Sequence, residues 1–349
     1  MNTVASIVAI VAAWGAFYID GGQSAKDIRA QLFDEEMTDA EFSARPEAGD
    51  EYRTAYATTS DVLQAFSIPF TEKGAATFAP NTIPLGEFKI DALLTPKVAR
   101  KSWLGFLASD KTVKPEEYGI IRWAIEKLFI PKAKEEYEKE VAWYGWAITG
   151  YDATPNVTTT GWIREHTSES DAQPSNGAMD GIWIHILKNL ARINVINTGA
   201  VGTDAAAWCT KVETFAAGID APLRRKIDKL FMSEANYNLY REGRRLKYNI
   251  NYESVMDLTA IKDCTIQVAY LRSMDGSDKI WGTPKENRIR PTHTENNGNF
   301  DVQPSDRSVK ILTDWKKGIG FEVPEYVVTN DLENTIPLGT LQSRYGLPV

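Results

Sequence analysis

The sequence has few of the side chains that carry out most protein chemistry. It holds two cysteines, Cys209 and Cys264, and three histidines, His166, His185 and His293, none of them in metal or redox spacing. Two cysteines in a chain of 349 residues are no disulfide framework, and a zinc site needs three or four ligands held together. We therefore predict free thiols, no metal and no cofactor.

Motifs that mark catalysis are also missing. There is no Gly-x-x-x-x-Gly-Lys-Ser/Thr phosphate loop, no Gly-x-Gly-x-x-Gly and no Gly-x-Ser-x-Gly elbow. A glycosidase needs only two correctly spaced carboxylates, so the sequence leaves a carbohydrate-active protein open. The missing motifs favour a structural protein over an enzyme.

Basic residues are scarce at the start of the chain. Between Met1 and Asp61 there are eleven acidic and four basic residues, so −7 of the net charge of −8 lies there. A domain that reads DNA sequence normally has a basic surface. The composition therefore argues against sequence-specific DNA binding and predicts an acidic, extended arm ahead of a nearly neutral body.

One apolar run interrupts the acidic start, from Val4 to Ile19. It is shorter than the roughly 20 residues that cross a bilayer. A secretory signal begins with positive charge, but no Lys or Arg precedes this run. We interpret it as a hydrophobic arm that packs on a partner subunit, and a leftover signal or anchor is the alternative. The candidate interface residues of this run are Val4, Ile7, Ile10, Trp14 and Phe17.

The pattern then changes to a strand and a long helix. Glu87 to Leu94 alternates apolar and polar residues as a strand does, and an apolar stretch with interface candidates Trp103 and Phe106 follows. From Pro115, apolar residues recur at helical spacing for about 34 residues, interrupted by a proline that predicts a kink. The residues expected in the core of this helix are Trp123, Leu128, Phe129 and Pro131.

The second half of the chain predicts a mixture of helices and strands, so the fold class is α+β. Helices are expected at 179–193, 204–217 and 234–247, the last after a buried strand at 229–232. Beyond residue 262 the pattern is that of strands, at 265–271, 279–281, 300–303, 309–313 and 320–329.

Several short stretches occur in an order that resembles the major capsid proteins of tailed phages, which have the Hong Kong 97-like fold. The similarity is strongest to phages of Bacteroidota, crAss-like phages among them. The start of the chain matches no part of this pattern. The stretches that carry the resemblance are Glu87 to Pro96, Ser102 to Leu107, Ile130 to Lys132 with Glu135 and Glu136, Phe231 to Ser233 with Tyr240, Trp281 to Asn287, Phe300 to Gln303, Asp306 to Lys310 and Asp314 to Phe321.

The resemblance implies a division of the chain and a function. It implies an N-terminal arm over 1–75, an E-loop-like excursion over 76–112, a spine helix with the peripheral domain over 113–262, and axial-domain strands with a tail over 263–349. The implied protein is a capsid subunit, found in the virion and in the host cytoplasm during assembly. Its implied partners are copies of itself in hexamers and pentamers, a portal, minor or decoration proteins and, by non-specific proximity, packaged double-stranded DNA, with no membrane.

Two other functions remain open. An encapsulin-like nanocompartment shell would share the fold and enclose cargo enzymes instead of DNA. A carbohydrate-binding or carbohydrate-active surface protein would fit the ten tryptophans, fourteen tyrosines and low isoelectric point. Such a protein would be a monomer or small oligomer, whereas both shells would be very large.

Overall fold

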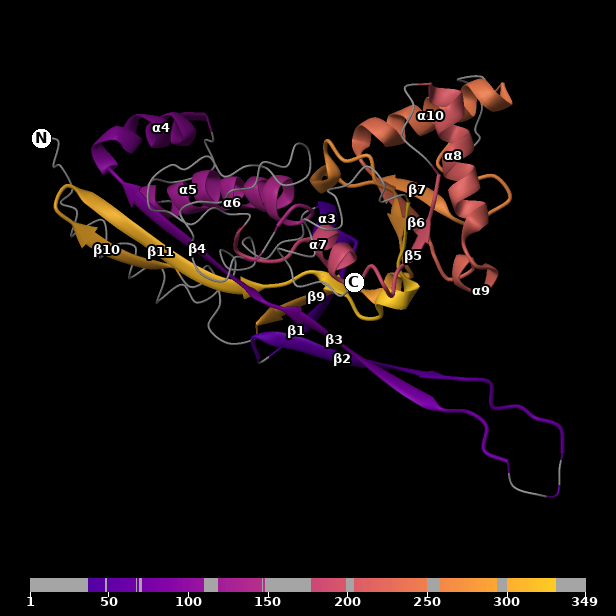
Figure 1. Cartoon of the computed structure of the whole chain (residues 1–349). Coiled ribbons are helices and arrows are strands. Elements are labelled where there is room, and N and C mark those ends of the chain that lie inside the picture. The colour runs from indigo at the N-terminus through magenta and orange to yellow at the C-terminus, as the bar shows by residue number, and fades with distance from the viewer. Residues whose placement is uncertain are drawn as a thin grey trace, which may run out of the picture.

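The computed structural model describes residues 37–47, 49–66, 68, 71–109, 119–145, 147, 177–198, 204–249, 258–293 and 300–330. In these residues the molecule is elongated, with two lobes side by side and a thin two-stranded ribbon projecting below them (Figure 1). The apolar run predicted at 4–19 lies outside the described residues.

The first lobe is a long sheet covered by a helix. Its six-stranded sheet has the order β1-β9-β11-β10, with β12 paired to β9 and β4 paired to β11. The strands alternate buried and exposed residues, so one face is free to pack against helices. The strands are β1 (Ser43–Glu47), β4 (Gly86–Leu94), β9 (Arg288–His293), β10 (Asp301–Ser305), β11 (Ser308–Lys317) and β12 (Gly320–Phe321).

The predicted long helix runs without a break from Ile120 to Val141 and lies on this sheet (Figure 1). This helix begins at Ile120, after the extended Gly119, and the expected start at Pro115 lies outside the described residues. Two of its turns are π-helical. The segments are α5 (Ile120–Ala124), η1 (Ile125–Phe129), α6 (Ile130–Glu136) and η2 (Tyr137–Val141).

The π turns move two of the predicted core residues to the surface. Trp123 is 6% exposed and packs with Leu94, Val309 and Ile311 of the sheet. The expectation is wrong for Leu128, which is 43% exposed, and for Pro131, which is exposed. A π turn holds one residue more than an α turn, so buried Ile125 is followed on the same face by Ile130, whose N–H donates to the Ile125 carbonyl.

The second lobe packs helices against a smaller sheet. This five-stranded sheet has the order β5-β13-β8-β6-β7, and α8 packs against α10 beside it. The two helices approach closely at Gly243, where an added Cβ would lie 1.9 Å from the Ala205 carbonyl oxygen. The elements are β5 (Asn194–Ile196), α8 (Ala205–Gly218), α9 (Ala221–Arg224), β6 (Lys229–Met232), α10 (Glu234–Tyr248), β7 (Gln267–Tyr270), η4 (Arg272–Met274), β8 (Trp281–Gly282), η5 (Lys285–Asn287), η6 (Pro324–Tyr326) and β13 (Val328–Asn330).

An aromatic core joins the two lobes. Trp143 stacks on Trp183, with ring centroids 5.7 Å apart, and on Trp281, at 6.4 Å. Trp281 also stacks on Phe231 at 4.7 Å. Because these rings come from the end of the spine, from α7 (Ile182–Lys188) and from β6 and β8, their burial holds distant parts of the chain together.

The structure divides the chain differently from the predicted domains. Residues 37–47, expected in an extended arm, form the short helix α3 (Met37–Ala40) and strand β1 inside the first lobe. The boundary at 75 falls within one hairpin, made of β2 (Glu51–Thr59) and β3 (Ala76–Pro84). Strands β10 and β11, expected in the axial domain, pack with the spine helix, because neighbours in a sheet need not be neighbours in sequence.

Candidate assembly surfaces

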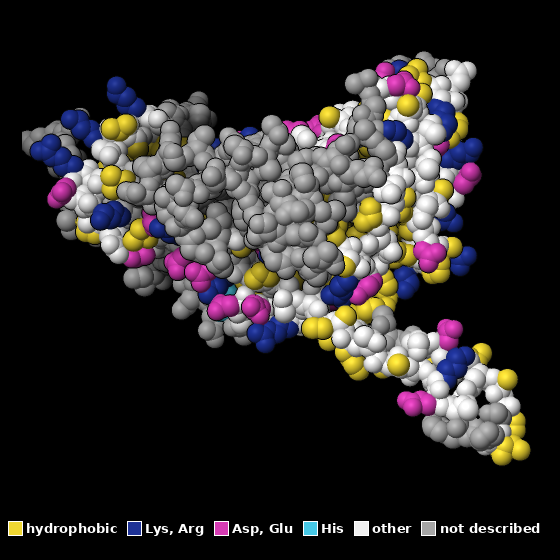
Figure 2. All heavy atoms as spheres, viewed as in Figure 1, with side chains coloured by type: hydrophobic (Ala, Val, Ile, Leu, Met, Phe, Trp, Pro, Cys, Tyr) yellow, Lys and Arg dark blue, Asp and Glu magenta, His cyan; other side chains and the backbone are white. Residues whose placement is uncertain are grey.

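The tip of the β2–β3 ribbon exposes large apolar side chains. The two strands pair antiparallel over their whole length, from Glu51 opposite Pro84 to Thr59 opposite Ala76. Beyond the last pair, the residues connecting the strands carry four apolar side chains that are between 62% and 94% exposed, and Figure 2 shows apolar atoms at this end. These four are Val62, Leu63, Phe66 and Ile68. An isolated hairpin with an uncovered apolar tip favours a contact with another protein surface.

A second surface, at the opposite end of the molecule, combines apolar and basic side chains. The helix α4 (Pro96–Ser109) contains no acidic residue, and Lys97, Arg100 and Lys101 are exposed on it. Lys and Arg side chains gather at this end in Figure 2. Val98 of the helix and Leu93 of β4 are also exposed, at 75% and 64%. We call this the α4 surface.

The root of the ribbon is fixed to the body by packing and hydrogen bonds. Ile83 is buried against Gly320, where an added Cβ would lie 2.9 Å from the Ile83 side chain. The Asn81 amide donates to the Phe321 carbonyl at 2.7 Å, and the Thr54 hydroxyl donates to the Glu322 carbonyl at 3.0 Å. The ribbon is therefore anchored at its root, and the described residues make no comparable contact with its tip.

A buried ionic cluster holds the segment before the ribbon. Asp39 is 1% exposed and accepts hydrogen bonds from Arg290 at 3.0 Å, from the Tyr137 hydroxyl at 3.0 Å, and from Lys317. Burial alone would raise the pKa of Asp39, but Lys317 and Arg290 hold it below its usual value. Glu138 of the spine accepts from the Thr38 hydroxyl at 2.5 Å. Residues 37–39 are thus tied to the sheet and to the spine.

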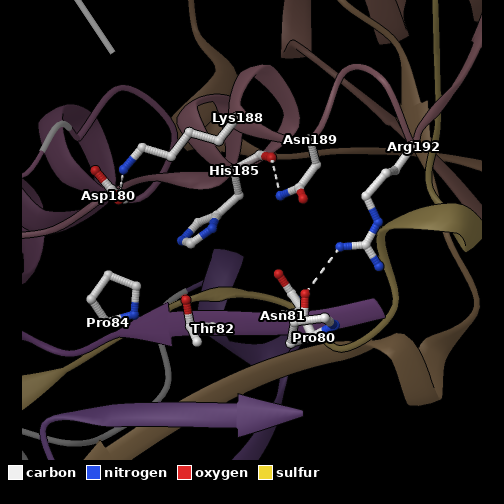
Figure 3. Close-up of a pocket in the computed structure, with 9 residues that line it drawn as sticks. All are labelled: Pro80, Asn81, Thr82, Pro84, Asp180, His185, Lys188, Asn189 and Arg192. Atoms are coloured by element: carbon white, nitrogen blue, oxygen red, sulfur yellow. Dashed lines mark hydrogen bonds and ion pairs between the residues drawn. The ribbon is translucent and has the colours of Figure 1, made fainter. Parts of the chain in front are cut away.

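A slot lies between the ribbon root and α7 (Figure 3). Its volume is about 390 Å³. Figure 3 shows the imidazole of His185 pointing from α7 toward Thr82 of β3, with Lys188 and Asp180 at one end and Arg192 at the other. The nine lining residues are Pro80, Asn81, Thr82, Pro84, Asp180, His185, Lys188, Asn189 and Arg192.

Of the predicted interface residues, the structure describes two, Trp103 and Phe106. Val4, Ile7, Ile10, Trp14 and Phe17 lie outside the described residues. Trp103 lies on α4, half-buried against the core under the spine, and Phe106 lies on the same helix. Phe129 of the spine is partly buried in that core.

Sequence reasoning missed the ribbon tip and the slot. The tip could have been found, because 62–70 holds five large apolar residues between turn residues and outside any amphipathic pattern. The slot could not, because its two walls are about a hundred residues apart in sequence.

The described residues show neither a metal centre nor a membrane span. No group of three or more His, Cys, Asp or Glu side chains in them is arranged to hold a metal ion. Among the described helices, none is both long and apolar enough to cross a membrane.

Comparison with solved structures assigns the fold. A chain of the satellite phage P4 procapsid, a particle that includes the size determination protein, superposes with a TM-score of 0.51 at 10% identity, over 88% of this chain and 90% of that one. The chain has the Hong Kong 97-like capsid fold. The capsid of the Myoviridae phage XM1 is also similar, with a TM-score of 0.49 and 10% identity over 84% of this chain and 90% of that one. No protein-family model and no curated protein matches the sequence.

The comparison bears on two predictions from sequence. The α+β class is confirmed, as is the likeness to tailed-phage capsid subunits at the level of fold. Within this fold, the ribbon tip and the α4 surface lie at opposite ends of the molecule (Figure 1).

Proposed function

We propose that this chain is a major capsid protein that self-assembles, through hexamers and pentamers, into an icosahedral shell around phage double-stranded DNA. The observation that carries the proposal is the apolar tip of the ribbon, which the described part of the chain leaves uncovered. The capsid fold supports it. No catalytic activity is part of the proposal.

Burial of the tip is strong enough to drive association. Covering one large apolar side chain contributes roughly 1.5–3 kcal/mol. Four such side chains project from the tip, so a neighbour that covers them gains several times this value before ordering costs are subtracted. A shell repeats the contact at every subunit, so modest contacts add up to a stable particle.

The α4 surface of a second copy is the proposed receiving site for the tip. Its exposed Leu93 and Val98 offer apolar area, and its three basic side chains complement Asp61 and Glu72, which are exposed beside the tip. Because both surfaces belong to every subunit and lie far apart on it, the contact is heterologous, the kind of contact that builds rings when the rotation between neighbours closes. Trp103 and Phe106, on the same helix, would lie near this contact.

Other partners follow from the proposal. A closed shell that packages DNA needs a portal, and minor or decoration proteins bind the outside of many shells. The net charge of −8 fits a subunit that stays near DNA without binding it specifically. We place the protein in the virion, and in the host cytoplasm during assembly. The finer likeness to phages of Bacteroidota remains a prediction from sequence.

Electron microscopy of the purified protein tests the proposal. We expect closed shells of megadalton size in negative stain, together with free hexamers or pentamers. Particles from infected cells should contain nuclease-protected double-stranded DNA. Shells that hold protein cargo without DNA would support a nanocompartment instead. A stable monomer at micromolar concentration across several salt conditions would contradict both, and would favour a carbohydrate-binding protein.

A further inference from the structure

The slot at the ribbon root has a surplus of hydrogen-bond donors over acceptors. Its one acid, Asp180, is 1% exposed, and both its oxygens are occupied, one by the Ala147 N–H at 3.1 Å and the other by Lys188. Lys188 has two further N–H groups and its side chain is 38% exposed. At the other end, the Arg192 guanidinium donates to the Pro80 carbonyl at 3.3 Å and pairs with Glu325.

His185 lies in the slot with a ring nitrogen that has no hydrogen-bond partner among the described residues. It is 5% exposed, and its Nε2 atom has no hydrogen-bond partner in the part of the chain that the structure describes. A buried polar atom of this kind costs free energy unless a partner is supplied. Figure 3 shows the ring directed into the space between α7 and β3, so a group entering the slot meets the imidazole.

We propose that the slot binds a carboxylate, the acidic side chain of a second copy of this chain. A carboxylate is an acceptor with two oxygens, and it would accept hydrogen bonds from Lys188 and from the hydroxyl of Thr82. The N–H tautomer of His185 at Nε2 would supply a third donor. The occupied slot would bridge β3 and α7, so a neighbour would fix the direction in which the ribbon leaves the body.

Two observations favour a second copy as the source of the carboxylate. The chain has 47 acidic and 39 basic residues, so an adjacent subunit presents more carboxylates than cations. The slot lies at the root of the ribbon, which the proposed function, on which this inference rests, places at contacts between subunits. A volume of about 390 Å³ accommodates one side chain with part of its backbone.

Substitution at Thr82 tests the occupant. Thr82 is exposed on β3, so Thr82→Glu places a carboxylate in the slot from the subunit's own chain and competes with the neighbour. Thr82→Gln has nearly the same size without the charge and is the matched control. We expect Thr82→Glu to raise the critical concentration for assembly about tenfold relative to Thr82→Gln, equivalent to about 1.4 kcal/mol. Equal assembly of the two variants would overturn the proposal.

Zero-length crosslinking identifies the source of the carboxylate. Shells are assembled from equal parts of ¹⁵N-labelled and unlabelled wild-type protein and treated with a carbodiimide, which joins an amine to a carboxylate in contact. We expect peptides containing Lys188 to be linked to an acidic peptide in mixed-isotope pairs, which form only between subunits. Links to Asp180 in unmixed pairs alone would overturn the inference and leave the shell intact as a proposal.

The two proposals fail in different ways. Absence of any particle from wild-type protein would overturn the proposed function, and this inference with it. If added acetate changes assembly but Thr82→Glu does not, the slot binds a free anion, and the second copy is overturned as its occupant.

Discussion

Asp39 shows how one buried charge fixes the start of the described chain. Its two cationic partners come from β9 and β11, some 250 residues away, so the ion pairs tie α3 to the sheet. Removing one member of such a group leaves the others buried and uncompensated, which costs more than the intact pair contributes. The carboxylate therefore positions residues 37–47, from which the ribbon departs.

Asp39→Asn should destabilise the subunit strongly. We expect a loss of about 3–5 kcal/mol in the free energy of unfolding, because Lys317 and Arg290 lose their counter-charge. Urea unfolding followed by tryptophan fluorescence measures it. Asp50→Asn is the matched control, since Asp50 pairs with Lys316 at 2.7 Å but is exposed, and its loss should be small. Equal losses in both variants would show that burial of Asp39 does not matter.

His185 should make the stability of the subunit depend on pH. Burial lowers the pKa of His185 to about 4, compared with 6.5 for a free histidine. The charge of Asp180 acts to raise this pKa, and the charge of Lys188 acts to lower it. Between these values the unfolded chain binds a proton that the folded chain does not, so stability falls as the pH falls. From pH 6 to pH 5 the free energy of unfolding should drop by about 1.2 kcal/mol, because the unfolded histidine is already partly neutral at pH 6.

His185→Gln tests this expectation, because glutamine does not titrate in this range. Chemical unfolding of wild type and variant at pH 6 and pH 5 should show a smaller drop in the variant. Identical slopes in the two proteins would assign the pH dependence to other groups.

At the scale of elements, the spine shows where a sequence pattern succeeds and where it stops. Apolar spacing indicated a long helix with Trp123 in its core, because the spacing of near neighbours is local information, and in the structure Trp123 is buried against the sheet. The π turn at Ile125–Phe129 was not foreseen, and within it Leu128 faces outward while Ile130 takes the buried position. The spacing of apolar residues cannot reveal the extra residue of a π turn when apolar side chains stand both where an α turn and where a π turn would bury them.

Truncations on the spine should reflect this rotation. Trp123→Ala should cost about 3–5 kcal/mol in the free energy of unfolding, as large aromatic truncations do in cores. Leu128→Ala, on the exposed side of the same helix, should cost under about 1 kcal/mol. Thermal or urea unfolding of the two variants side by side gives the comparison. If Leu128→Ala lost more free energy of unfolding than Trp123→Ala, the helix would have to be rotated so that Leu128 faces the sheet.

The ribbon tip should matter for assembly and not for folding. The double change Leu63→Ser and Phe66→Ser removes two side chains that are 88% and 94% exposed in the subunit. We expect unchanged subunit unfolding and a loss of shells in electron microscopy, because the buried area between copies is lost. Leu246→Ser on α10, exposed at 56%, is the control and should assemble normally. Shells of normal size from the double variant would place the subunit contact elsewhere.

At the scale of the whole molecule, the sequence indicated the class and many elements but not their grouping. Helices at 204–217 and 234–247 and the strand at 229–232 agree with α8, α10 and β6 within one or two residues, because capping and periodicity are local. The pairing of β4 with β11, more than two hundred residues apart, and the insertion of β1 beside β9 depend on tertiary packing. The ionic cluster depends on the contact of residues 37–47 with β9 and β11, and the slot depends on the packing of β3 beside α7, so neither could be predicted.

The boundary between arm and body can be tested by two deletions. If residues 1–61 were an extended arm, as the composition predicts, their removal would leave a folded body. The structure contradicts this, because Asp39 and Phe42 are buried in it and β1 pairs with β9. Deleting 1–36 keeps every described element, whereas deleting 1–61 removes α3, β1 and one strand of the ribbon.

The two shortened proteins should therefore differ in whether they fold. The protein without residues 1–36 should keep its circular dichroism spectrum and its cooperative melting transition. The protein without residues 1–61 should lose that transition or aggregate, because Lys317, Arg290 and the ring of Trp281, 6.2 Å from Phe42, lose buried partners.

If residues 1–36 also lock the shell, as we expect of an apolar arm, the shorter deletion will fold but form fewer or less heat-resistant particles. Normal particles from it would show that the lock lies within the described elements, and a folded product of the longer deletion would show that residues 37–61 are an arm after all.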